Sequence, residues 1–220
     1  SLEDIKKSGK LVVGLSADYP PYEFTAKVDG KTEYVGIDIE IAKKLAKDLG
    51  VKLEIKNMSF DSLLVALETN KVDAIISAMN PTPERKESVD FSDIYYSGKQ
   101  YMVINKKDAS KYKSLADFKG QTVGAQNGSL QYNLVKDQMP GTTVKGLSKL
   151  NNLVLALQSG KVSGIAMEEP TAKAYVANNS QLLAFDPGFS VSSDQTGSAI
   201  AFRKNSPALV AAANKTLAQI

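Results

Sequence analysis

Hydrophobic residues recur with two spacings that alternate along the chain. Short apolar runs rich in β-branched residues predict buried strands, at residues 11–15, 51–55 and 72–76. Apolar residues three and four apart predict a helix from Ile37 to Gly50 and a second helix that Asp61 caps. Pro83 suits a first helical position and predicts a short helix from Thr82 through Val89. Strands that alternate with helices indicate a mostly parallel α/β sheet.

The same alternation returns in the second half of the chain. Strands are expected at residues 122–125, near Val144 and at 162–166, and helices from Ser129, Ser148 and Pro170. Residues 63–76 align with residues 153–166 at six identical positions of fourteen. Amphipathic helix-turn-strand units can converge on such patterns, but the alignment together with the repeated alternation favours two similar α/β lobes.

Two strand-like segments are placed to connect these lobes. Residues 95–104 lead from the first repeat into the second, and residues 197–202 precede a final helix that begins at Ser206. We therefore expect lobe 1 at residues 1–97 and 198–220, lobe 2 at residues 98–197, and a hinge near 96–99 and 194–197. A cleft between α/β lobes is a common place for a ligand.

Composition narrows the functional classes. The 27 Lys and Arg residues against 24 Asp and Glu leave a charge of +3 and are scattered, which argues against a nucleic-acid partner. No apolar run approaches the ~18 residues of a membrane span. Cys and His are absent, which excludes thiol nucleophiles, Cys or His zinc sites and Ser-His-Asp triads. No catalytic residue, metal site or cofactor is predicted, and the start at Ser1 suggests that any signal peptide is removed or was never present.

Polar and aromatic residues follow the predicted strands of the first lobe. Ligands of open α/β sheets bind beyond the carboxyl ends of parallel strands, so the loop at 16–24, with three aromatic residues, is a candidate surface. In the loop at 77–86, Arg85 and the start of a helix can bind an anion, and a guanidinium matches a carboxylate with two hydrogen bonds. Arg85 also lies in a charged run that suits a solvated helix face, so both interpretations stay open.

The second lobe supplies the opposite charge. Gly128 and Ser129 form a turn whose N–H groups suit either an anion or ordinary helix capping. Glu168 and Glu169 end a strand before the helix at Pro170, and Glu169 is accounted for by the helix dipole. Glu168 is then a partner for an ammonium group, and the two lobes together predict a zwitterion site.

These residues also resemble a known family. The matching segments are Asp18–Phe24, Gly36–Ile39, Phe60–Asp61, Thr82–Lys86, Val89–Ser92, Val123–Gly124 with Gly128, and Glu168–Pro170. In this order they are similar to the signature of extracytoplasmic polar amino-acid-binding proteins of ABC importers, solute-binding protein family 3. The resemblance covers essentially the whole chain. It implies the two-lobed periplasmic-binding-protein fold, in which each lobe is a mostly parallel sheet flanked by helices and two crossover strands join the lobes.

The resemblance also assigns roles. Arg85 would bind the ligand α-carboxylate, Glu168 with the Ala78 carbonyl would bind the α-ammonium, and Tyr19 with Phe60 would enclose the side chain. Main-chain N–H groups around Asn80 and Ser129 would assist Arg85. The implied ligand-binding set is Ser16, Tyr19, Phe60, Ala78, Met79, Asn80, Arg85, Gly128, Ser129, Leu130 and Glu168.

Three positions depart from the family pattern. Ser16 stands where several basic-amino-acid binders have Asp, Asn80 replaces the usual Ser or Thr, and Glu168 replaces the commoner Asp. The arginine class and the glutamine class of ligand therefore both remain open. Family members usually continue some twenty residues further, so a truncation after Ile220 stays an open alternative.

The expected function is that of a non-catalytic receptor that captures a polar L-amino acid between its lobes. It would deliver this ligand to the membrane subunits of an ABC importer by hinge closure, as a monomer, outside the cytoplasm, either in the periplasm or lipid-anchored on the cell membrane. One alternative is the ligand-sensing domain of a receptor. Another is a lyase or dehydratase on the same fold, although no second catalytic group accompanies Glu168 or Glu169.

Overall fold

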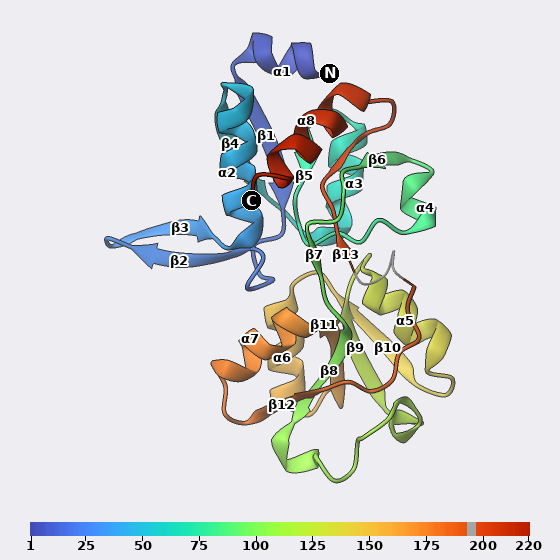
Figure 1. Cartoon of the computed structure of the whole chain (residues 1–220). Coiled ribbons are helices and arrows are strands. Elements are labelled where there is room, and N and C mark those ends of the chain that lie inside the picture. Colours follow the sequence, from blue (N-terminus) through green and yellow to red (C-terminus); the bar gives the residue numbers. More distant parts are fainter. Residues whose placement is uncertain (193–196) are drawn as a thin grey trace. The chain divides into compact units, whose positions relative to one another are not determined.

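A computed structural model describes residues 1–192 and 197–220 (Figure 1). The chain forms two compact units, unit 1 from Ser1–Ser97 with Ser193–Ile220 and unit 2 from Gly98–Ser192. Each unit contains one five-stranded sheet with helices packed on it, as the hydrophobic pattern predicts. Of the expected hinge segment at 194–197, only Gly197 lies within the described residues, so the hinge stays a prediction.

The sheet of unit 1 has the strand order β4-β1-β5-β14-β6. Its strands are β1 (Lys10–Leu15), β4 (Lys52–Asn57), β5 (Ala74–Ile75), β6 (Val89–Phe91) and β14 (Ala201–Arg203). β1 runs parallel to β4 and β5, while β14 runs antiparallel to β5 and β6. The carboxyl ends of β1, β4 and β5 therefore lie at one edge of the sheet.

Helices and two short strand pairs complete unit 1. The helices are α1 (Leu2–Ser8), α2 (Ile37–Leu49), η1 (Phe60–Ser62), α3 (Leu63–Glu68), α4 (Pro83–Lys86) and α8 (Pro207–Leu217). The strand pairs are β2 (Phe24–Val28) with β3 (Lys31–Val35), and β7 (Tyr96–Ser97) with β13 (Gly197–Ser198). In Figure 1 the β2-β3 hairpin extends away from the sheet of this unit.

The sheet of unit 1 is buried on both faces, which explains the unbroken apolar run in β1. Leu11 and Val13 pack with residues of α2 and α8, and Val12 packs on the opposite face with α3. Burial of each such aliphatic side chain is worth about 1.5–3 kcal/mol.

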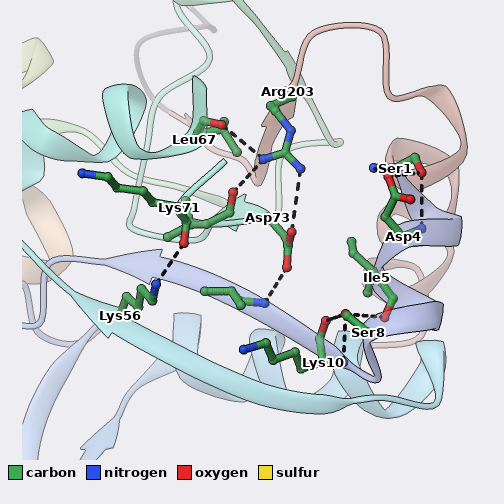
Figure 2. Close-up of polar contacts among 12 residues, drawn as sticks. Ser1, Asp4, Ile5, Ser8, Lys10, Lys56, Leu67, Lys71, Asp73 and Arg203 are labelled. Atoms are coloured by element: carbon green, nitrogen blue, oxygen red, sulfur yellow. Dashed lines mark hydrogen bonds and ion pairs between the residues drawn. The ribbon is translucent and has the colours of Figure 1, made fainter. Parts of the chain in front are cut away.

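A polar network fixes β14 to the turn between α3 and β5 (Figure 2). The Arg203 guanidinium donates to the carbonyls of Leu67 (3.2 Å) and Val72 (2.7 Å) and lies 3.7 Å from the Asp73 carboxylate. Asp73 in turn accepts a hydrogen bond from the Val12 N–H at 2.8 Å. Arg203, near residue 220, thus links two elements from the first half of the sequence, α3 directly and β1 through Asp73.

Unit 2 has the strand order β10-β9-β11-β8-β12. Its strands are β8 (Gln100–Asn105), β9 (Thr122–Gln126), β10 (Thr143–Leu147), β11 (Gly164–Glu168) and β12 (Leu182–Phe185). Its helices are η2 (Lys106–Asp108), η3 (Leu115–Phe118), α5 (Leu130–Gln138), α6 (Leu150–Gln158) and α7 (Glu169–Ala177). β9 is parallel to β10 and β11, and β8 is antiparallel to β11 and β12.

The aligned segments of the repeat adopt the same local structure. In unit 1 the segment forms α3 and β5, and in unit 2 it forms α6 and β11. Leu63 and its counterpart Leu153 are fully buried, while Val65 and its counterpart Leu155 are 59% and 62% exposed. The two segments therefore share their buried and exposed positions as well as their sequence.

Several elements differ from the sequence prediction. The helix expected through Val89 ends at Lys86, because Val89 is buried in β6 and pairs with β14. Asp61 lies inside η1 and caps no helix. The strand-like run 95–104 is split into β7 and β8, which pair with different partners.

Candidate functional site

The loop after β1 is anchored to the loop after β5. The Ser16 N–H donates to the Ser77 hydroxyl at 3.1 Å, and the Ser16 hydroxyl donates to the Asp18 carboxylate at 3.1 Å. The Tyr19 N–H donates to the Glu23 carbonyl at 2.8 Å and closes the loop on itself. Because all of these residues are buried, the loop is a fixed surface.

The loop after β5 has an unusual backbone at Ala78. Ala78 has a φ of 50°, in the left-handed region that non-glycine residues seldom adopt. Its N–H donates to the Asp38 carboxylate at 2.8 Å, which holds this conformation. The Met79 carbonyl accepts from the Ala199 N–H at 2.9 Å, and the Asn80 side-chain amide donates to the Gly197 carbonyl at 2.6 Å.

Arg85 meets Asn80 and Phe60. It lies in α4, whose N-cap Thr82 accepts a hydrogen bond from the Arg85 N–H at 3.3 Å. The guanidinium donates to the Asn80 carbonyl at 2.9 Å and lies 5.6 Å from the centre of the Phe60 ring. Arg85 is 9% exposed, so it does not project from a solvated helix face. A guanidinium oriented in this way can bind a carboxylate with two hydrogen bonds.

A buried acid pair lies behind both loops. Glu23 and Asp38 are fully buried neighbours, because Glu23 accepts from the Ser77 hydroxyl and Asp38 accepts from the N–H of the next residue, Ala78. Burial, and then the negative charge of Asp38, raise the pKa of Glu23 well above its usual range. Burial also raises the pKa of Asp38, which accepts a 2.5 Å hydrogen bond from Tyr95. Burial and the Asp38 charge raise the pKa of the Tyr95 phenol.

In unit 2, the turn after β9 caps α5. Gly128 has a φ of 74°, and the Ser129 hydroxyl accepts from the Tyr132 N–H at 3.2 Å. The Ser129 N–H donates to the Gln126 carbonyl at 3.2 Å. Leu130 follows as the first, buried residue of the helix. This geometry makes helix capping one role of Ser129.

Glu168 and Glu169 have different surroundings. Glu168 ends β11 and is 1% exposed, whereas Glu169 lies in the first turn of α7. The Glu169 carboxylate contacts the Lys173 ammonium at 2.5 Å, and this hydrogen bond lowers the pKa of Glu169. Glu168 is therefore the carboxylate that the fold buries.

Three buried glutamines belong to the elements around Glu168 and were not predicted as site residues. Gln100 lies opposite Glu168 in the β8-β11 ladder, and its carbonyl accepts from the Gln131 amide at 2.8 Å. Gln100, Gln126 and Gln131 are all buried. Gln131, directly after Leu130 at a helix start, is the one that its sequence position could have suggested.

The predicted residues thus gather in one group on each unit. The Arg85 group, at the carboxyl ends of β1, β4 and β5, consists of Ser16, Tyr19, Phe60, Ala78, Met79, Asn80 and Arg85. The Glu168 group, at the carboxyl ends of β9 and β11, consists of Gly128, Ser129, Leu130 and Glu168. A guanidinium such as that of Arg85 can bind a carboxylate, and a carboxylate such as that of Glu168 can bind an ammonium group.

The described part of the chain contains no cluster of Asp and Glu suited to a metal ion. Within residues 1–192 and 197–220, no helix has the length and apolar character to cross a membrane.

Known proteins resemble this chain over almost its whole length. Residues 11–220 match the family described as bacterial extracellular solute-binding proteins, family 3. The arginine-binding extracellular protein ArtP of Bacillus subtilis is 41% identical over 90% of this chain and 75% of its own length. ABC transporter arginine-binding protein 1 of Escherichia coli is 34% identical over 96% of this chain and 85% of its own.

Solved structures give the same result. An amino acid ABC transporter substrate-binding protein from Streptococcus pneumoniae, crystallised with L-arginine, superposes with a TM-score of 0.95 and 39% identity. The match covers 99% of this chain and 90% of that chain.

Proposed function

Because this chain belongs to the bacterial extracellular solute-binding proteins of family 3, we propose that it captures an L-amino acid and delivers it to an ABC importer. Family membership confirms the expected two-lobed α/β fold, the extracytoplasmic location and the non-catalytic class. The observation that carries the proposal is the Arg85 group, in which a buried guanidinium is oriented by Asn80 and Phe60.

The proposed ligand belongs to the arginine class. Relatives at 41% and 34% identity are arginine-binding proteins, which favours arginine over glutamine. The Arg85 group also lies beside Asp18, a buried acid that accepts from the Ser16 hydroxyl, and a cationic ligand side chain would offset its charge. Ser16 itself carries no charge, so Asp18 would supply what an Asp at position 16 supplies in several basic-amino-acid binders.

The residue roles follow from the two groups. Arg85 binds the α-carboxylate, and Glu168 binds the α-ammonium with the Ala78 carbonyl. Tyr19 and Phe60 flank the ligand side chain. The remaining members, which shape the two loops, are Ser16, Met79, Asn80, Gly128, Ser129 and Leu130.

The partners and the motion belong to the same proposal. The protein acts as a monomer, and its two lobes, residues 1–97 with 198–220 and residues 98–197, close on the ligand about the hinge near 96–99 and 194–197. The closed form is the one that the membrane subunits of the importer recognise. A lipid anchor on the cell membrane, or free diffusion in a periplasm, would keep the receptor near that importer.

Titration calorimetry tests the proposed ligand class. Arginine, lysine, glutamine and citrulline are titrated into the protein, because citrulline matches arginine in shape but has no charge. We expect arginine to bind at least tenfold more tightly than citrulline and glutamine. If glutamine bound more tightly than arginine, the arginine class would be contradicted. If none of the four compounds bound, the receptor function would be contradicted. Incubation with arginine should leave its concentration unchanged, because no reaction is expected.

A further inference from the structure

The buried acid pair stands between the two binding loops of unit 1. Glu23 belongs to the loop after β1 and accepts from Ser77 in the loop after β5. Asp38, in the first turn of α2, accepts from the Ala78 N–H at 2.8 Å and from the Tyr95 hydroxyl at 2.5 Å. The pair therefore contacts both loops that carry the Arg85 group.

The surroundings of the pair favour one proton. One carboxylate oxygen of Glu23 is buried and has no N–H or O–H donor within reach, and its fully buried neighbour Asp38 is bonded to the residue after Ser77. Two adjacent negative charges away from water repel each other strongly, and neither carboxylate can donate a hydrogen bond while both are ionised. A proton on the Glu23 oxygen turns that oxygen into the missing donor to Asp38.

In the described part of the chain, the charged groups that act most strongly on Glu23 are Asp38 and Asp18, and both are negative. Tyr95, whose pKa is raised, donates to Asp38 as a neutral phenol. Burial and these charges raise the pKa of Glu23 well above its usual range, in agreement with the geometry.

We propose that Glu23 and Asp38 share one proton and act as a positioning pair that holds the two binding loops in place. The proton lets Glu23 donate to Asp38, and Asp38 keeps its negative charge for the Ala78 N–H. That hydrogen bond stabilises the left-handed Ala78, whose carbonyl belongs to the Arg85 group. Loss of the proton would place two repelling charges between the loops and separate them.

The direction of the pH effect follows from linkage. Glu23 keeps its proton to a higher pH in the folded chain than in the unfolded chain, so the folded protein binds more protons between these two pKa values. The unfolding equilibrium constant should therefore rise with pH in this window, by up to tenfold per pH unit for one proton. Stabilisation by the pair is complete below the unfolded pKa and is lost as pH rises through the folded pKa.

The test compares Glu23→Gln with the wild type and with Glu33→Gln, which replaces an exposed glutamate on β3 of the same unit. The amide that Glu23→Gln introduces can donate to Asp38 without titrating. In ligand-free protein at pH 7, infrared spectra should show the carbonyl stretch of a neutral carboxylic acid in the wild type and in Glu33→Gln. This band should be absent from Glu23→Gln. Urea unfolding from pH 5 upward should show the predicted slope in the first two proteins and a reduced slope in Glu23→Gln.

Ligand binding supplies the functional readout and rests on the proposed function. Wild-type affinity for L-arginine should fall as pH rises through the titration of the pair, whereas the affinity of Glu23→Gln should stay constant over that window. Asp38→Asn, which removes the charge that holds Ala78, should weaken binding about tenfold or more at every pH. A missing acid band, or equal stability slopes in Glu23→Gln and the wild type, would overturn the shared proton. If arginine failed to bind the wild type, the proposed function would fall while the two ligand-free measurements still decided the proton.

Discussion

The Arg85 guanidinium is held by groups of its own chain. It donates to the Asn80 carbonyl and lies over the Phe60 ring while it is largely buried. Its orientation is therefore set before a ligand binds, which lowers the entropic cost of ordering it on binding.

We predict that Arg85→Ala weakens arginine binding by about 2–5 kcal/mol, roughly thirty- to several-thousand-fold, because a desolvated ligand carboxylate loses its partner. Arg85→Lys should recover part of the loss, since an ammonium keeps the charge but cannot form the planar pair of hydrogen bonds. Calorimetry measures both variants, with Lys86→Ala as the control on the exposed side of α4. A loss below about threefold in Arg85→Ala would contradict this role.

Two adjacent glutamates allow a paired prediction. Glu168→Gln should weaken binding by at least tenfold, because a buried carboxylate loses its charge-assisted bond to the ligand ammonium. Glu169→Gln removes only a surface pair with Lys173 at a helix start, worth ~0.3–1 kcal/mol of folding stability, and should leave affinity within about twofold. Equal losses of affinity in the two variants would contradict the distinction.

For single residues, the sequence indicates which side chains follow predicted strands. It does not indicate which side chains become neighbours only in the tertiary structure. Arg85 and Glu168 were proposed as site residues because they lie in loops that follow predicted strands and match the family pattern. Glu23 and Asp38 are fifteen positions apart, and Asp38 looks like an ordinary acid in the first turn of a helix. They become neighbours because the β2-β3 hairpin folds back and brings Asp38 beside Glu23, and no local sequence pattern encodes this.

At the scale of elements, Gly36 sets the path of the chain from the β2-β3 hairpin into α2. It has a φ of 125° and joins β3 to α2, where the N–H groups of Ile37 and Asp38 donate to the Pro21 and Tyr22 carbonyls. A Cβ at Gly36 would lie 2.7 Å from the Pro21 carbonyl oxygen and closer still to that of Tyr22. The absence of a side chain therefore allows Asp38 to approach Glu23.

Gly36→Ala should lower the free energy of unfolding by about 2–5 kcal/mol, from backbone strain together with the clash. Gly50→Ala is the matched control, because Gly50 also has a positive φ, at 71°, but open space around its missing side chain. That control should lose only about 1–2 kcal/mol. Urea unfolding measures both variants, and equal losses would show that the clash is relieved at no cost.

The elements also show where sequence patterns suffice. Long helices such as α2, with a 3.6-residue apolar period and a glycine at the end, were predicted nearly to their bounds. The β2-β3 hairpin was missed although Asp29 and Gly30, with φ values of 52° and 80°, form the Asp-Gly turn that favours hairpins. The turn signal was present, and β2 alternates apolar with polar residues, but both strands are short and largely exposed and β3 begins with three polar residues, so no buried strand was predicted there.

At the scale of the whole molecule, the proposed closure can be measured directly. The chain has no cysteine, so Val65→Cys and Leu155→Cys introduce two labels at exposed, equivalent positions of the repeat, one on each unit. Arginine should shorten the mean distance between the labels, because the ligand needs groups from both units. The same label pair in Arg85→Ala, at the same arginine concentration, should show no shortening. An unchanged distance at saturating arginine in the labelled parent would reject closure.

The position of β14 has a consequence for how the newly made chain folds. β14 lies between β5 and β6, and Arg203 ties it to the α3-β5 turn, so the sheet of unit 1 needs residues that follow the whole of unit 2 in the sequence. The strands and helices of unit 2 all come from the contiguous stretch Gly98–Ser192. When the chain is made or exported from its N-terminal end, unit 2 therefore has all of its strands before unit 1 does, and we expect it to complete its fold first. The strands of unit 1 that precede unit 2 would remain an incomplete sheet until β14 becomes available.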